Sequence, residues 1–566
     1  MQMAVQPVRQ RCEAHQLRGT VEQLSERQWD YIIVGTGMGG ATVGHSLAQA
    51  GKSVLFVEKG RSHLRSYAAL SDDYAESFFS RREAPGPQHH EALANAGRYT
   101  EAVEDVSGTK KRSFIPFIGS GTGGSSALYG MALERFFPQD FRPATVHGGN
   151  DATSPLAWPV NYDELLPFYQ RAEYLFRVRG GVDPLRNSNK IEYLLPPQLM
   201  PPNQALHDFL LGKGLHPYQL PMACEQIPDC RGCQSFLCSK SCKNDSSRMC
   251  LQPAIDNYGA QLLDECEVLR IEASSTAVDK LICSHQGKEI KLSASRFIVA
   301  AGALETPRLL LNSSSTDWPA GLGNKTGLIG KNLMRHYIDL YAVFTGDKIE
   351  PGSRIKELAF NDLYDGENGK LGSVQSFGFL PPPAILVEEM ERDIRHDLGA
   401  IAAAAFKLIK PLARFGLGTM LSRAVILAST MEDAPSENNR LTLSDEPDAL
   451  GRSKIQLSYT ISDGEHRRIE TLRNKMKKVL SPYRYLLLKQ ADNNQRIAHI
   501  CGTCRFGEDP QQSVCDGNNK MHGLDNLYIA DSSVFPTSGG INPSLTIAAL
   551  SLRLAQHLEG PSNDRI

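Results

Sequence analysis

A glycine-rich segment near the amino terminus constrains the fold of this 566-residue chain more than any other feature. Residues 29–34 (WDYIIV) predict a short buried strand, residues 41–50 a helix and residues 53–57 a second strand. The first strand and the helix are separated by four glycines: Gly35, Gly37, Gly39 and Gly40. A strand, a glycine-rich turn, a helix and a strand in this order are typical of the β-α-β unit that binds dinucleotides.

Each position in this unit has a predicted task. Gly35 permits a tight turn, Gly37 lets the backbone approach a pyrophosphate, and Gly40 allows the helix to pack closely on the strand. The pyrophosphate is expected at the amides of the helix amino terminus. Glu58, directly after the second strand, is placed to accept hydrogen bonds from the ribose of an adenosine.

A second cluster of glycines and serines occupies residues 119–131 and contains Gly123, Gly124, Ser125 and Ser126. Apolar residues flank it on both sides, so it does not have the surroundings of a flexible linker. We interpret it as a loop whose backbone presses on a large planar ligand. This favours FAD over NAD as the dinucleotide.

Four stretches together resemble the glucose–methanol–choline (GMC) oxidoreductase family, whose members depend on FAD. They are the unit from Gly35 to Glu58, the double-glycine loop, AAGALETPRLL at residues 300–310, and a terminal block that starts at His499. The resemblance implies an α/β fold. A Rossmann-like FAD-binding domain of discontinuous segments would carry an inserted α+β substrate domain, an antiparallel sheet with helices.

The resemblance also sets the predicted domain boundaries. These are a polar leader at 1–28, the first part of the FAD-binding domain at 29–155, a substrate-side, cysteine-rich segment at 156–250, a second FAD-binding part at 251–335, the substrate-binding domain at 336–494, and the carboxyl-terminal FAD-binding part with the catalytic motif at 495–566.

His499 and Asn542 match the positions where the family carries its catalytic pair. Oxidation of an alcohol needs a base for the hydroxyl proton, and a histidine serves near neutral pH. An amide can hold the forming alkoxide by donating a hydrogen bond. The resemblance further assigns cofactor contacts to Ala301, Asp531, Asn542 and Pro543. Some family members tether FAD through a histidine, but Ala127, Leu128 and Tyr129 stand there, so we expect non-covalent FAD.

Six cysteines fall between Cys224 and Cys250, a spacing typical of thiolate metal sites. Within the family, a subgroup of bacterial sugar and polyol dehydrogenases carries an iron–sulfur cluster at about this point. Cys233, Cys238 and Cys242 resemble its ligands. Zinc, disulfides and free thiols remain the alternatives.

The predicted substrate is an alcohol, with a hydroxyl of a sugar, cyclitol or glycosylated natural product preferred. The electrons would pass to oxygen, a quinone or a protein. The rival hypotheses are an FAD-dependent lyase or isomerase, an oxidase of a lipophilic alcohol, and an electron-transfer subunit. The formal net charge of −2 argues against a nucleic-acid partner.

The sequence predicts a cytoplasmic protein, because it shows no signal peptide and no apolar stretch long enough to cross a bilayer. Residues 398–431 are rich in Ala, Leu and Ile and contain Lys407, Lys410, Arg414 and Arg423. We expect a core helix pair with a solvated basic edge there. The alternative is a lid, or an amphipathic surface that touches a membrane or a lipophilic substrate.

Overall fold

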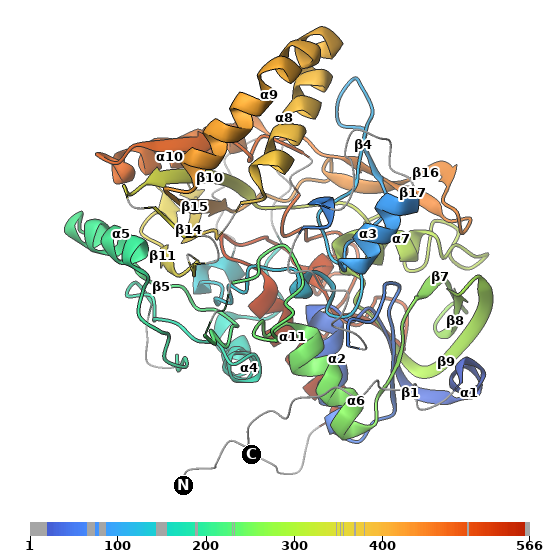
Figure 1. Ribbon diagram of the computed structural model, residues 1–566. Coiled ribbons are helices and arrows are strands. Elements are labelled where there is room, and N and C mark those ends of the chain that lie inside the picture. The colour runs from blue at the N-terminus through green and yellow to red at the C-terminus, as the bar shows by residue number, and fades with distance from the viewer. Residues whose placement is uncertain are drawn as a thin grey trace.

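The computed structural model has two main sheets, seen in Figure 1 around β1 and β7–β9 and around β10, β14 and β15. It describes residues 20–560, except 65–73, 78–86, 143–155, 187–190, 229, 231, 347, 351–352, 355, 367–368, 379 and 495–496.

The first sheet has seven strands in the order β6-β2-β1-β9-β8-β7, with β19 also paired to β9. Its parallel part contains β6, β2, β1, β9 and β19, whereas β8 and β7 run antiparallel. The bounds are β1 (Gln28–Val34), β2 (Val54–Val57), β6 (Gln261–Leu263), β7 (Cys266–Ala273), β8 (Val278–His285), β9 (Lys288–Val299) and β19 (Leu527–Ile529). The predicted β-α-β unit is confirmed as β1, α2 (Met38–Gln49) and β2.

Helices cover this sheet and bring distant segments together. The carboxyl-terminal helix α11 (Ser544–Glu559) packs against α2 and against α4 (Tyr162–Leu175). Nearly all of α2 is buried, which its small and apolar residues permit. Further helices are α1 (Val21–Glu26), α3 (Pro87–Asn95), α6 (Gln252–Tyr258) and α7 (Gly302–Leu311).

The second sheet has six strands in the order β18-β10-β15-β14-β11-β5, all paired antiparallel. The bounds are β5 (Tyr218–Gln219), β10 (Tyr337–Phe344), β11 (Leu358–Phe360), β14 (Gly372–Ser376), β15 (Ala424–Met431) and β18 (Tyr485–Leu488). Helices α5 (Pro201–Gly212) and α10 (Asp463–Leu480) lie on this side of the molecule in Figure 1. The predicted α/β class with an antiparallel substrate sheet is confirmed.

Two of the predicted boundaries divide an element or a sheet of the fold, and the division into domains stays a prediction. The leader predicted for residues 1–28 includes a capped helix, α1, and the start of β1. A four-stranded sheet, β16-β17-β3-β4, draws strands from two predicted domains. β3 (Val103–Asp105) and β4 (Arg112–Phe114) belong to the segment assigned to the FAD-binding domain, yet β3 pairs with β17 (Ser453–Ser458) beside β16 (Arg440–Pro447). A small hairpin, β12 (Asp365–Gly366) and β13 (Gly369–Lys370), completes the strands of the described residues.

The segment predicted as a core helix pair is instead an exposed hairpin followed by a strand. Helices α8 (Pro383–Asp397) and α9 (Gly399–Leu421) pack on each other and project from the rest of the molecule (Figure 1). Only Ala403 and Lys410 of α9 are fully buried. The prediction was wrong because helical spacing of apolar residues does not reveal which side is covered. Within the described residues, no helix has the length and apolarity to cross a membrane.

Candidate active site

A cavity of about 440 Å³ is lined by residues from all four stretches that carry the family resemblance. The glycine-rich loops form one side of it, and residues Gln375, Ala428 and Thr430 of the second sheet form part of another. The predicted site residues that line it are Gly35, Gly37, Gly39, Glu58, Gly124, Ser125, Ser126, Ala301, His499, Asp531, Asn542 and Pro543. Gly40 and Gly123 are the sequence neighbours of the lining residues Gly39 and Gly124. The fold therefore brings together predicted site residues that are far apart in the sequence.

The glycines after β1 have geometries that larger residues could not adopt. Gly35 has a φ of +96°, in the left-handed region that favours glycine. A Cβ on Gly40 would lie 2.1 Å from the carbonyl oxygen of Gly35, so helix and turn touch directly. A Cβ on Gly37, by contrast, would meet nothing within 4 Å. Gly37 is also the residue that caps the amino terminus of α2. The free helix amides and the open space beside Gly37 fit a pyrophosphate.

The double-glycine loop packs against this turn. Gly124 has a φ of +49°, and a Cβ there would lie 3.0 Å from the Cα of Gly37. The amide of Gly123 donates to Thr36 Oγ1 at 3.3 Å. Ser126 Oγ donates to the carbonyl of Gly123 at 2.7 Å and thereby closes the turn. The two loops are thus held edge to edge along the cavity, as a dinucleotide in an extended conformation would require.

Glu58 joins the two loops. One carboxylate oxygen accepts from the amide and hydroxyl of Thr36, at 3.1 and 2.7 Å, and the other from the amides of Gly60 and Gly121, at 3.0 and 3.1 Å. Burial raises the pKa of Glu58. Four protein donors occupy its acceptor positions, so Glu58 acts here as a clamp on the backbone. The contact with a ribose stays a prediction.

Asp531 likewise joins two backbone segments, at the end of strand β19. It follows β19, and its carboxylate accepts from Gly302 N at 2.9 Å and from Thr306 Oγ1 at 2.6 Å. The other oxygen accepts from Ser533 N at 2.8 Å. These bonds tie the start of α7, next to Ala301, to the segment that leads towards Asn542. The residues present therefore fit FAD along the whole cavity.

His499 forms a pair with a second histidine that sequence reasoning missed. The Nδ1 atoms of His336 and His499 lie 2.8 Å apart. His336 Nε2 lies 2.7 Å from the carbonyl oxygen of Gly539 and 3.1 Å from that of Ser538. Carbonyls only accept, so His336 Nε2 carries the proton and its Nδ1 is the acceptor. His499 Nδ1 then donates, and its Nε2 is left with a free lone pair.

The amide of Asn542 faces that lone pair. Its Nδ2 lies 3.4 Å from His499 Nε2, and its Oδ1 accepts from Gln375 Nε2 at 2.9 Å. Gln375 therefore fixes which end of the Asn542 amide points at the histidine. His499 itself has a φ of +58°, an uncommon backbone conformation for a residue with a side chain. The unprotonated Nε2 of His499 and the N–H donor of Asn542 thus lie next to each other in the cavity.

Burial and two neighbouring basic groups keep this histidine neutral. Burial, His336 and Lys356 together hold the pKa of His499 well below 6.5. Burial, with a smaller contribution from Lys243, lowers the pKa of Lys356 to about 7. A base with a low pKa is available over the whole neutral range, although its proton affinity is reduced. The geometry is that of a general base with an adjacent hydrogen-bond donor.

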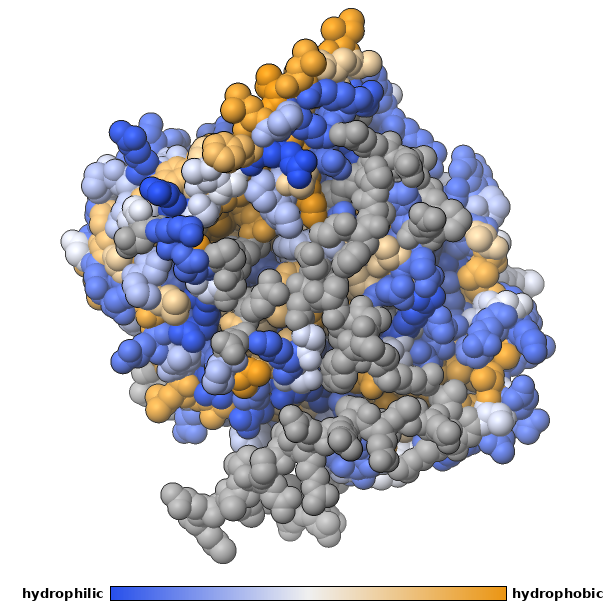
Figure 2. Space-filling view, in the orientation of Figure 1, coloured by the Kyte–Doolittle hydropathy of each residue, from blue (hydrophilic) through white to orange (hydrophobic). Residues whose placement is uncertain are grey.

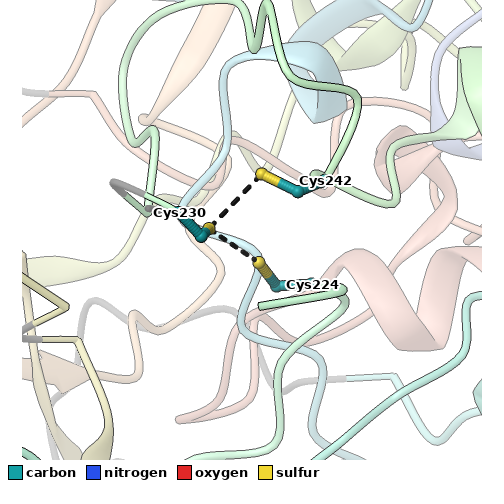
Figure 3. A group of neighbouring side chains, drawn as sticks. All are labelled: Cys224, Cys230 and Cys242. Atoms are coloured by element: carbon teal, nitrogen blue, oxygen red, sulfur yellow. Dashed lines mark hydrogen bonds between the residues drawn. The ribbon is translucent and has the colours of Figure 1, made fainter. Parts of the chain in front are cut away.

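The cysteine-rich segment folds into a chain of thiols beside the double-glycine loop. Figure 3 shows Cys224, Cys230 and Cys242, whose sulfur atoms lie within 4.8 Å of one another. Cys230 Sγ lies 3.6 Å from Cys224 Sγ and 3.3 Å from Cys242 Sγ. The hydrogen bond with Cys230 raises the pKa of the Cys224 thiol, while hydrogen bonds with Cys224 and Cys242 lower the pKa of Cys230. Cys238 Sγ extends the chain, 3.4 Å from Cys242 Sγ.

This arrangement does not support the predicted iron–sulfur ligand set of Cys233, Cys238 and Cys242. The group within 4.8 Å contains neither Cys233 nor Cys238. Four thiolates around one zinc ion would be about 3.8 Å apart, so sulfurs at 3.3–3.6 Å are too close to enclose several iron atoms. None of the eleven cysteines in the described part of the chain forms a disulfide. Lys243, which donates to the carbonyl of Ala127 at 2.8 Å, anchors this segment to the glycine loop.

Sequence reasoning missed four residues in or next to the second sheet: His336 directly before β10, Lys356 before β11, Gln375 of β14 and Thr430 of β15. None belongs to a motif. The strand alternation in residues 372–376 and 424–431 could have placed Gln375 and Thr430 on one face, because side chains alternate along a strand. It could not have said that this face meets the cavity.

A dinucleotide-binding fold whose cavity also contains a histidine base and an amide donor defines the class as an oxidoreductase. Two profiles described as GMC oxidoreductase match the chain, over residues 29–338 and 435–551. The chain belongs to the GMC oxidoreductase family, whose members are flavoenzymes that bind FAD. The resemblance inferred from sequence motifs is confirmed.

Relatives of known activity span nearly the whole chain at low identity. The 6'''-hydroxyparomomycin C oxidase of Streptomyces lividus is 28% identical over 560 residues, covering 94% of this chain and 92% of that protein. The fructose dehydrogenase large subunit of Gluconobacter japonicus is 24% identical, covering 93% and 97%. The crystal structure of pyridoxine 4-oxidase from Mesorbium loti matches with a TM-score of 0.64 at 18% identity, covering 95% and 100%, which shows a common fold.

Proposed function

We propose that this oxidoreductase converts an alcohol to an aldehyde or ketone with non-covalently bound FAD. The observation that carries the proposal is the free Nε2 lone pair of His499 facing the Asn542 amide at 3.4 Å in the cavity. When bound, FAD supplies the acceptor for the hydride of the alcohol carbon. The absence of a histidine at Ala127, Leu128 and Tyr129 supports a cofactor without a histidyl tether.

The residues of the chain act on the hydroxyl group. His499 Nε2 takes the hydroxyl proton, and His336 keeps the lone pair on that nitrogen by accepting from His499 Nδ1, 2.8 Å away. Asn542 Nδ2 donates to the substrate oxygen as negative charge develops on it. Both side chains are largely shielded from solvent, which strengthens these interactions. The histidine and the amide thus act on one oxygen atom.

The wall of the cavity favours a substrate with several hydroxyl groups. Gln375 Oε1 and Thr430 Oγ1 are buried and have no hydrogen-bond partner among the described protein atoms. Leaving such atoms unsatisfied costs free energy, and substrate hydroxyls would satisfy them. We therefore propose a hydroxyl of a sugar, cyclitol or glycosylated natural product as the group oxidised. Relatives named as a hydroxyparomomycin oxidase and a fructose dehydrogenase support this class.

An anaerobic spectroscopic assay tests the proposal. The FAD-loaded enzyme is mixed with a panel of amino sugars, hexoses, cyclitols and simple long-chain alcohols, and the flavin absorbance is followed. We expect bleaching by polyhydroxylated substrates, and much slower bleaching in His499→Ala at the same FAD content. If long-chain alcohols alone bleach the flavin, the substrate class is wrong. If no alcohol does, the alcohol-oxidation proposal fails and a lyase or isomerase takes its place.

The electron acceptor is proposed to be oxygen, a quinone or a protein, and turnover measured with each distinguishes them. We propose a cytoplasmic location, because cysteines without disulfides, as the eleven in the described residues are, suit a reducing compartment.

A further inference from the structure

Helix α9 is amphipathic, but its apolar side faces away from the rest of the protein. Its outward face carries Ile401, Leu408, Leu412 and Phe415, whose exposed fractions lie between 72 and 89%. At about 100° per residue these four positions fall on one side of the helix. Figure 2 shows the result as a hydrophobic ridge along the projecting hairpin. A helix in contact with water alone normally has its charges outside and its apolar residues inside.

The covered face of α9 carries the charge that the outer face lacks. Lys410 is buried between the two helices, where its Nζ lies 2.5 Å from Glu391 Oε2 of α8. Ala403 is buried on the same side. The covered side of the hairpin therefore contains an ion pair together with small and apolar residues, whereas the larger apolar side chains of α9 point outward. An exposed apolar ridge of this kind is typical of a surface that a membrane or another molecule covers.

The exposed charges of α9 are positive. Lys407 and Arg414 flank the apolar ridge, and the helix contains no acidic residue from Gly399 to Leu421. Lys407 Nζ lies 3.7 Å from Glu391 Oε1 of α8, yet half of the Lys407 side chain is exposed, so its charge stays accessible to a partner. A surface of anionic headgroups over apolar chains complements both the cations and the ridge.

We propose that the α8–α9 hairpin docks this protein on an anionic lipid membrane, with the α9 ridge inserted at the depth of the headgroups. A convex ridge suits shallow insertion of this kind. The hairpin connects β14 to β15, the two strands that carry Gln375 and Thr430 in the cavity wall. Docking through α9 therefore holds the substrate sheet next to the lipid surface. This inference does not depend on which alcohol is oxidised.

Vesicle sedimentation of the full-length, FAD-loaded protein tests the docking. We expect co-sedimentation with mixed phosphatidylcholine–phosphatidylglycerol vesicles and weaker binding to phosphatidylcholine alone. The double variant Leu408→Ser/Leu412→Ser should lose binding by about ten-fold or more, since the insertion of apolar side chains provides much of the affinity. Leu195→Ser is the matched control, because Leu195 is exposed to 86%, close to the 84% of Leu408, but lies outside the hairpin.

Two further measurements separate the electrostatic contribution to membrane binding from that of the apolar ridge. Lys407→Gln/Arg414→Gln should remove the preference for anionic vesicles and leave the binding to phosphatidylcholine. A Phe415→Trp reporter should shift its emission to the blue when anionic vesicles are added. Failure of the unmodified protein to sediment with anionic vesicles would overturn the proposal. So would equal binding by the serine variant, or a dimer that forms without lipid and dissociates in that variant.

Discussion

Replacement of His336 by phenylalanine tests the arrangement of protons at the site. The ring of His336 accepts from His499 Nδ1, and a phenylalanine of similar size removes that acceptor. An N–H group left unpaired in a buried site costs about 1–3 kcal/mol. The His499 proton would then move to Nε2, where it blocks the base. Because 1.4 kcal/mol corresponds to a factor of ten in rate, flavin reduction should slow by about 5- to 150-fold.

Stopped-flow bleaching of bound FAD under anaerobic conditions, with a saturating alcohol, measures this effect. His336→Gln is the conservative control, because its amide can both accept from His499 and donate to the carbonyl of Gly539, and it should keep most of the rate. FAD content should be equal in both variants, since the glycine loops are untouched. Reduction by His336→Phe at the unmodified rate would refute the proton assignment, and equal losses in both variants would show that His336 acts through packing alone.

Three further predictions follow from other parts of the site. Gln375→Leu should raise KM for a polyhydroxylated substrate by about 5-fold or more, since it removes an acceptor and frees the Asn542 amide, and an unchanged KM would exclude Gln375 from substrate binding. Acid precipitation should release FAD into the supernatant, whereas flavin that remains in the pellet would show a covalent bond. Burial raises the pKa of Asp433 to about 7, above the 3.8 expected in the unfolded chain, so the folded state binds more protons between these values and the Tm should fall as the pH rises from 4 to 7. In Asp433→Asn this part of the pH dependence should disappear, and an unchanged profile would assign it elsewhere.

The cofactor side of the site could be predicted because its constraints are local. The backbone itself requires Gly35, which has a positive φ, and Gly40, which packs on the carbonyl of Gly35, whereas Gly37 leaves open space at the start of α2. The spacing of these glycines alone therefore indicates the turn and the helix that follows. His499 and Asn542 also stand in a contiguous terminal block, which carries the family resemblance.

The substrate side could not be predicted in the same way. His336 reaches His499 only through the fold, across 163 positions in sequence, and no local pattern marks it. Gln375 meets Asn542 because the antiparallel register of β14 and β15 turns that face towards the cavity. The prediction for the cysteines failed for a related reason. The resemblance in sequence suggested Cys233, Cys238 and Cys242, whereas the fold groups Cys224 and Cys230 with Cys242.

The most direct test of the account is the rate of flavin reduction in His499→Ala and Asn542→Ala, prepared with equal FAD content. Loss of a positioned base should slow reduction by about 10²- to 10⁴-fold, and loss of one hydrogen-bond donor to the alkoxide by about 10²- to 10³-fold. The double variant should lose less than the product of the two effects, because both groups act on the same oxygen. Reduction of the flavin in His499→Ala at the unmodified rate would show that the histidine is structural and would contradict the account.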